Sequence, residues 1–125
     1  MPEVEKSRKP RDFLYKPRQF GRVADAPWKD AAEADRYRLA AAYFQHRVAC
    51  QVVRAIDLDP DLTLDAFAKR IGMKTDTLRR KLYGSSTMTL EDVVALADAA
   101  GVDVLPVIQA RDDLFPPYSA NRGTA

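Results

Sequence analysis

The chain has 125 residues, of which 46% are hydrophobic and 30% are charged. This length suits one domain, and the apolar fraction is sufficient for a modest core. No apolar run approaches the roughly 20 residues that a membrane-spanning helix needs, and the first 20 residues lack the apolar stretch of a secretory signal. We therefore expect a cytoplasmic protein that makes no use of a membrane.

The single cysteine, Cys50, and the single histidine, His46, lie four residues apart in the sequence. Structural metal sites usually take four ligands, so we interpret His46 as a partly buried spacer and Cys50 as a core residue. The sequence offers no Cys–His or Ser–His–Asp set with a substrate cleft and no glycine-rich phosphate loop. We expect a protein that is not an enzyme and that needs no cofactor.

Charge is sorted along the chain, although its net value is only +2. Residues 1–22 carry seven basic and three acidic residues, and residues 69–81 carry six basic residues and one acidic residue. The rest of the chain has a net charge of −7. Such segregation favours a polyanionic partner, whereas a merely solvated surface would scatter the two signs.

Residues 1–27 contain four prolines, many basic residues and no sustained hydrophobic period, which predicts an extended or disordered basic arm. Phe13, Leu14, Tyr15 and Phe20 are too apolar for a simple tether. These side chains either pack back onto the domain or contact a partner, and the sequence leaves both alternatives open.

Residues 28–56 predict one long helix or two consecutive helices, because alanine is abundant and neither glycine nor proline appears. Apolar residues recur there near the helical period, which predicts a buried stripe. The stripe comprises Tyr37, Ala41, Phe44, Val48, Val52 and Ile56. Acidic residues and Pro60 then end the helix.

Two short amphipathic helices are predicted on either side of Gly72, with Thr63 and Thr75 as their N-caps. The apolar positions that would fix the angle between them are Leu64, Phe67, Ala68, Ile71, Leu78 and Leu82. A further helix follows to residue 100, because residues 89–92 have the pattern of a capping box. Residues 102–111 allow one more short helix.

The predicted fold is therefore all-α: a compact five-helix bundle over residues 28–111, with the basic N-terminal arm before it and a flexible C-terminal tail at residues 112–125. Two helices joined by a tight turn, the second of them outwardly basic, have the arrangement of a helix-turn-helix. The major groove of DNA admits one α-helix, whose first turn can point at base edges. The pattern thus indicates a helix at residues 75–83 that enters the major groove.

The segments TLDAFAKRIGMKTDTLRRKLYG (63–84) and MTLEDVVALADAAGVDVLPVI (88–108) resemble the lambda-repressor-like (Xre-type) helix-turn-helix DNA-binding domain family. The resemblance rests on an A-x-x-x-G at Ala68 and Gly72, on the closing Gly84, and on a helix that ends in A-x-G-V at residues 99–102. It covers roughly residues 40–110. It implies a five-helix DNA-binding domain and a transcriptional repressor of phage or bacterial origin.

Carried onto this sequence, the resemblance implies base contacts from Thr75, Asp76 and Arg80. The phosphate contacts that the spacing and the resemblance indicate are Lys69, Arg70, Lys74, Arg79, Lys81, Tyr83 and Ser85. The candidates for minor-groove or backbone contacts of the arm are Arg8, Lys9, Arg11, Arg18 and Arg22.

Three positions depart from the family's pattern. Leu64 stands where a glutamine often braces the first recognition residue, and Tyr83 stands where an asparagine commonly binds phosphate. Lys81 occupies a position that is often apolar, so its stem is expected to pack while its amine reaches outward. Asp76 has two interpretations: it accepts from a cytosine amino group, or it stabilises the helix N-terminus and pairs with neighbouring arginines.

Two functions remain open on the sequence. The first is a sequence-specific regulator that binds double-stranded DNA, as a monomer or as a homodimer that uses the long helix or the last one. The second is a protein-interaction module, an antitoxin or adaptor, that uses the long helix and the aromatic arm. The first hypothesis fails if Arg79 and Arg80 are tucked against the protein's own acidic residues.

Overall fold

The computed structural model describes residues 9–103. This range forms four α-helices: α2 (Arg36–Leu58), α3 (Leu64–Arg70), α4 (Thr75–Leu82) and α5 (Leu90–Ala100). Three short 3-10 helices precede them: η1 (Pro10–Phe13), η2 (Pro17–Gln19) and η3 (Glu33–Asp35). The all-α prediction is confirmed for this range, but it holds four α-helices and not five. The expected last helix and the C-terminal tail lie outside the described residues from residue 104 onward.

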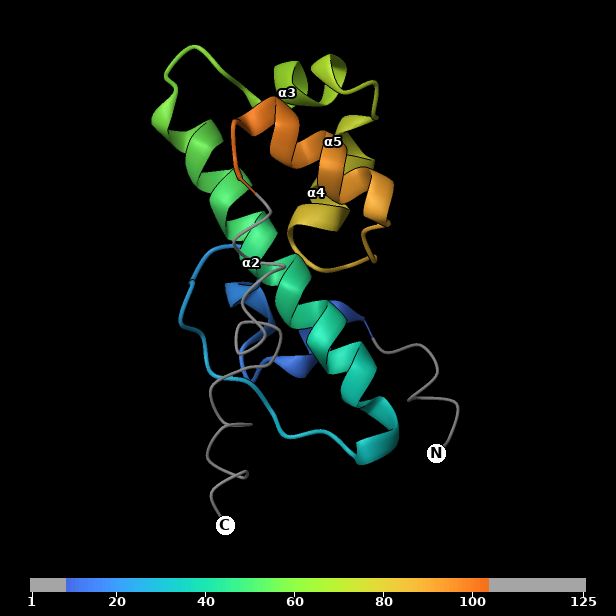
Figure 1. Cartoon of the computed structure of the whole chain (residues 1–125). Helices are drawn as coiled ribbons and strands as arrows, with labels where there is room; N and C mark the ends of the chain where they lie inside the picture. The colour runs from blue at the N-terminus through green and yellow to red at the C-terminus, as the bar shows by residue number, and fades with distance from the viewer. Residues whose placement is uncertain (1–8, 104–125) are drawn as a thin grey trace.

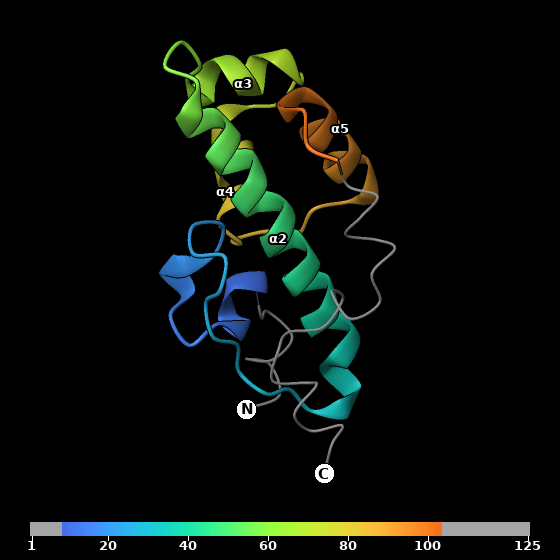
Figure 2. The ribbon, with the colours of Figure 1, turned by 60° about the vertical axis from the view of Figure 1, so that its left-hand side comes forward.

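Helix α2 is the axis on which the other elements pack. Figures 1 and 2 both show α3, α4 and α5 gathered around its C-terminal part, while the N-terminal segment lies against it below α4. Helix α2 contacts η1, η3, α4 and α5, and α3 packs on α4. No helix in the described part of the chain has the length and apolarity that crossing a bilayer requires.

Helix α2 begins later than predicted. Residues 28–32 are not helical, and η3 leads into α2 at Arg36. The reason is that Trp28 is drawn into the core by the N-terminal segment, where it forms an antiparallel bridge with Leu14. Lys29 donates its backbone N–H to the Phe13 carbonyl at 2.8 Å, which fixes this stretch as extended chain.

The buried stripe of α2 is correct in its C-terminal half and wrong in its N-terminal half. Val48, Val52 and Ile56 are buried as predicted, but Tyr37 and Ala41 are exposed. Leu39 and Ala42 take the inward positions instead. The face is rotated there because the N-terminal segment, and not only α4 and α5, packs on α2.

The N-terminal segment is not an extended arm over residues 9–27. Phe13, Leu14, Phe20 and Ala26 are all buried in the same core as the helices. Apolar burial is favourable by about 25 cal/mol per Å², so these side chains stabilise the docked segment although it contains prolines and charges. Of the four apolar residues that the sequence left open, Phe13, Leu14 and Phe20 pack back onto the domain, whereas Tyr15 is exposed.

The connection between α3 and α4 is a tight turn at Gly72. Gly72 adopts a φ of +69°, its N–H donates to the Lys69 carbonyl, and the N–H of Met73 donates to the Ala68 carbonyl at 2.9 Å. This pair of bonds is the Schellman arrangement, which favours glycine at the left-handed position. The predicted stop at Gly72 is confirmed, and it places α4 across the end of α3.

Candidate nucleic-acid interface

Helix α4 has a buried apolar side and an exposed charged side. Leu78 and Leu82 are fully buried, whereas Asp76, Arg79 and Arg80 are exposed. The predicted N-cap is wrong by one position: Lys74, and not Thr75, is the N-cap residue of α4, and it makes no side-chain capping bond. Thr75 therefore lies inside the first turn, where its half-buried side chain is near the helix N-terminus.

The exposed cations of α3 and α4 lie on both sides of the Gly72 turn. They are Lys69, Arg70, Lys74, Arg79 and Arg80. Among the described residues Lys69, Arg70 and Lys74 form no ion pair, and the exposed acids of the same two helices are Asp65 and Asp76. The turn thus carries an excess of positive charge that is held in place by the buried leucines and Phe67.

Asp76 pairs with both arginines of α4. Its carboxylate lies 2.9 Å from Arg80 and 3.6 Å from Arg79. The three side chains are 54–65% exposed, and exposed pairs of this kind contribute only about 0–1 kcal/mol. Asp76 thus lies in the first turn of α4 and pairs with neighbouring arginines, as the second interpretation predicted. Both arginines therefore lie against one of the protein's own acidic residues, which counts against the first hypothesis, although all three side chains remain exposed.

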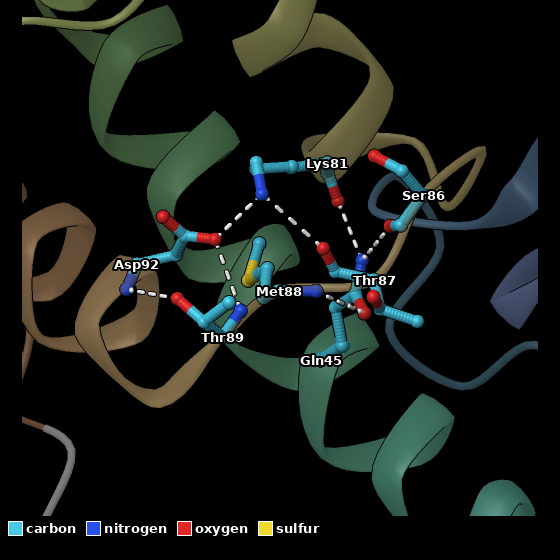
Figure 3. Close-up of polar contacts among 7 residues, drawn as sticks. All are labelled: Gln45, Lys81, Ser86, Thr87, Met88, Thr89 and Asp92. Carbon is cyan, nitrogen blue, oxygen red and sulfur yellow. Dashed lines mark hydrogen bonds and ion pairs between the residues drawn. The ribbon is translucent and has the colours of Figure 1, made fainter.

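The Lys81 amine was expected to reach outward, but it points into the protein. Its Nζ donates to Asp92 at 2.6 Å and to the Thr87 carbonyl at 3.3 Å (Figure 3), and both charged side chains are less than one-fifth exposed. Burial alone would raise the pKa of Asp92, but hydrogen bonds from Lys81 and Thr89 outweigh burial and lower it. The expected outward reach of the Lys81 amine is wrong, because its charge joins α4 to α5, and the predicted phosphate contact of Lys81 stays a prediction.

Gln45 of α2 anchors the loop between α4 and α5 and was missed by sequence reasoning. Its Nε2 donates to the carbonyls of Lys81 and Ser86 at 2.8 and 2.9 Å, and its Oε1 accepts from the N–H of Met88 (Figure 3). The side chain is buried. The only sequence signal is a polar residue within an otherwise apolar face of α2.

Tyr83 and Ser85 lie just past the C-terminal end of α4. Tyr83 is the C-cap residue, and its ring lies 4.5 Å from the guanidinium carbon of Arg22. The backbone N–H of Ser85 donates to the Arg80 carbonyl at 2.8 Å, so the hydroxyl is the group left for a phosphate. Both side chains are half-buried.

The basic residues of the N-terminal segment are brought to this end of α4. Arg11, Arg18 and Arg22 line a hollow with Tyr83, and the backbone N–H of Arg11 donates to the Gly84 carbonyl at 3.2 Å. Lys9 is exposed, and its backbone N–H is bonded to Asp12. Arg8 lies outside the described residues.

His46 is the residue that fastens the N-terminal segment to α2. Its Nδ1 accepts from the Gly21 N–H, and its Nε2 donates to the Val23 carbonyl, each at 2.9 Å. These partners fix the neutral tautomer, since an amide can only donate and a carbonyl can only accept. Burial lowers the pKa of His46 below its ordinary value of 6.5, and the bond to Val23 opposes this only partly.

Cys50 lies beside His46, with its Sγ 3.6 Å from Nε2. Burial raises the pKa of the Cys50 thiol to about 11, so the thiol stays protonated and unreactive at neutral pH. The part of the chain that the structure covers contains no group of three or more potential metal-ligating residues. His46 is more deeply buried than predicted, and its role is to bind backbone.

No model of a protein family matches this chain, and no significantly similar protein was found among curated proteins or among solved structures.

Proposed function

We propose that this protein is a sequence-specific DNA-binding regulator of the helix-turn-helix class that reads the major groove with α4. The observation that carries the proposal is the division of α4 into a side of fully buried leucines and a side of exposed arginines. Such a division presents polar and cationic groups at the position from which a recognition helix contacts base edges. The resemblance of residues 63–108 to lambda-repressor-like domains supports the same function.

The resemblance assigns Arg80 to a base, and Arg79 beside it is assigned to a phosphate. Both side chains are more than half exposed, so both can reach a duplex. Arginine binds the O6 and N7 atoms of guanine through two hydrogen bonds. Lys69, Arg70 and Lys74 flank α4 as phosphate contacts. The ion pairs to Asp76 are exposed and weak enough to exchange for such contacts.

The proposal is tested first by the salt dependence of DNA binding. Neutralising about four phosphates should weaken binding on the order of 10²-fold between 50 and 200 mM salt, since each neutralised phosphate releases counterions. Selection of bound fragments from random duplex DNA supplies the site and shows whether it is palindromic. Binding that is undetectable at 50 mM salt, or that does not change with salt, contradicts the proposal.

Two variants separate reading of bases from contact with phosphates. Arg80→Ala should cost about 1–3 kcal/mol on the selected site and relax preference at one base pair. Lys74→Ala should weaken binding to selected and random duplexes alike, and should lower the salt slope by about 1. Binding curves for both variants on both duplexes give the measurement. Equal losses on both duplexes for both variants would refute the assignment of Arg80 to a base.

A second candidate function is a protein-interaction module, and one feature favours it. An apolar groove of about 510 Å³ runs between the N-terminal half of α2, η1 and the start of α5. Tyr37 and Leu90 at this groove are 66% and 74% exposed. The aromatic residues Phe13 and Phe20 are not available to a partner, because both are buried. A stoichiometric partner lost on Leu90→Asp, in a protein that binds no DNA, would favour this function.

A further inference from the structure

Three arginines from the N-terminal segment line a hollow beside Tyr83, the residue that follows α4. Arg11, Arg18 and Arg22, together with Pro17 and Tyr83, line a hollow of about 280 Å³. No carboxylate is among the residues that line it. The Arg22 guanidinium lies over the Tyr83 ring, 4.5 Å from its centre. The hollow is therefore strongly cationic and has one aromatic wall.

The backbone around this hollow is fixed by the core. Arg11 donates its N–H to Gly84, and Gly21, next to Arg22, donates its N–H to the buried ring of His46. Between the arginines, Phe20 is fully buried. The cations are thus carried by a folded segment below the end of α4 in both views (Figures 1 and 2). Binding an anion there does not require the segment to be ordered first.

We propose that this arginine hollow is a fixed phosphate-binding site that holds the DNA backbone beyond the C-terminal end of α4. The proposal rests on the proposed function and adds a second, sequence-independent contact to it. Guanidinium groups bind phosphate oxygens through paired, charge-assisted hydrogen bonds. Stacking on Tyr83 restricts the Arg22 side chain, which lowers the entropy lost on binding.

The position of the hollow identifies the backbone of duplex DNA as its ligand. Tyr83 directly follows α4 and is its C-cap residue, so the hollow continues the cationic surface that begins at the Gly72 turn. A duplex seated on α4 has phosphate strands on both sides of the helix. We therefore expect the hollow to extend the footprint on one strand without adding sequence preference.

The test compares two arginines of the hollow with Arg38, which also lies over a tyrosine ring but pairs with Asp35. Arg18→Gln and Arg22→Gln remove exposed cations of the hollow, and Arg38→Gln removes an arginine that stacks on Tyr37 with its guanidinium 5.5 Å from the ring centre. Each hollow variant should weaken binding to every duplex about five- to tenfold at 100 mM salt, and should lower the salt slope by about 1. Arg38→Gln, at the start of α2, should bind as the wild type does.

Arg22→Lys tests whether geometry matters as well as charge. Lysine keeps the charge but lacks the planar guanidinium, which stacks on Tyr83 and donates two parallel hydrogen bonds to a phosphate. The salt slope should therefore equal that of the wild type, while the affinity for duplex DNA falls two- to threefold. If Arg22→Lys binds with wild-type affinity, the hollow attracts DNA only through its charge, and the proposal of a fixed phosphate-binding site is wrong.

The remaining outcomes separate this inference from the proposed function. Wild-type binding that neither Arg18→Gln nor Arg22→Gln changes would overturn the hollow alone. A wild type that binds no duplex would overturn the hollow and the proposed function together. If a polyglutamate peptide binds and depends on Arg18 and Arg22 while duplex binding does not, the hollow belongs to an acidic protein partner, and the proposal is wrong.

Discussion

The two basic regions of the chain have similar charge, but different forces hold them. The α3–α4 region is placed by local helix packing on Leu78 and Leu82, whereas the N-terminal segment is placed by buried aromatic residues and by His46. Within the α3–α4 region, Lys81 forms an ion pair with Asp92 and is not available on the surface. Clustered charge in a sequence therefore locates cations but does not tell which of them remain on the surface.

The largest test of this comparison removes the anchor of the N-terminal segment. Phe20→Ala should lower the free energy of unfolding by about 3–5 kcal/mol, because the ring is fully buried and leaves a cavity. Urea unfolding gives the value, and Tyr15→Ala, at an exposed aromatic residue of the same segment, should stay within about 0.5 kcal/mol. A loss below about 1 kcal/mol for Phe20→Ala would mean that docking contributes little to the fold.

The second test compares neighbouring cations of α4. Lys81→Ala should cost about 1–3 kcal/mol of stability, since it leaves the half-buried Asp92 without its partner. Arg79→Ala should cost no more than about 1 kcal/mol, because its pair with Asp76 is exposed and 3.6 Å long. Urea unfolding of both variants measures the difference. Equal costs would show that exposure does not decide the value of these pairs.

The third test uses pH to weaken only the bonds between His46 and the N-terminal segment. Because burial lowers the pKa of His46 in the folded protein, the unfolded state takes up a proton first as pH falls. Stability should therefore decrease below about pH 6.5, by up to about 1.4 kcal/mol per pH unit. Unfolding measured between pH 8 and pH 5 checks this. His46→Gln should remove the dependence down to pH 5, and a persistent slope in that variant would assign it to another group.

The smallest effect on stability is expected at Asp76. Asp76→Asn removes two exposed ion pairs and a favourable charge near the helix N-terminus, for a loss of about 0.3–1 kcal/mol. If α4 binds DNA, the same change should strengthen binding severalfold on every duplex, because both arginines are released and one repulsive charge is removed. Loss of affinity confined to sites with one particular cytosine would instead support a base contact by Asp76.

The helices around Gly72 were predictable because their determinants are local. Leu78 and Leu82 are four residues apart, Thr63 and Thr89 cap the helices that follow them, and Gly72 ends α3. The docking of the N-terminal segment was not predictable. Its partners lie far away in the sequence, as Gly21 and His46 do, and no hydrophobic period marks the segment.

The candidate site was likewise predictable only where its contacts are local in the sequence. The spacing of the leucines predicted that Arg79 and Arg80 lie on the solvent-facing side of α4. It also allowed both to pair with Asp76, which lies three and four positions before them on the same helix. Spacing could not reveal that Lys81 reaches Asp92 on another helix, or that Arg22 covers Tyr83. Both contacts depend on how helices and loops meet in three dimensions.

The bond from His46 to Val23 also makes the segment observable. The one ring N–H proton of His46, on Nε2, points at a carbonyl inside the protein, so it exchanges with solvent when the segment lifts from α2. Its exchange rate, followed as a low-field imidazole resonance in NMR spectra, therefore reports the free energy of that local opening directly. One native atom thus reports how tightly residues 9–27 are bound to α2.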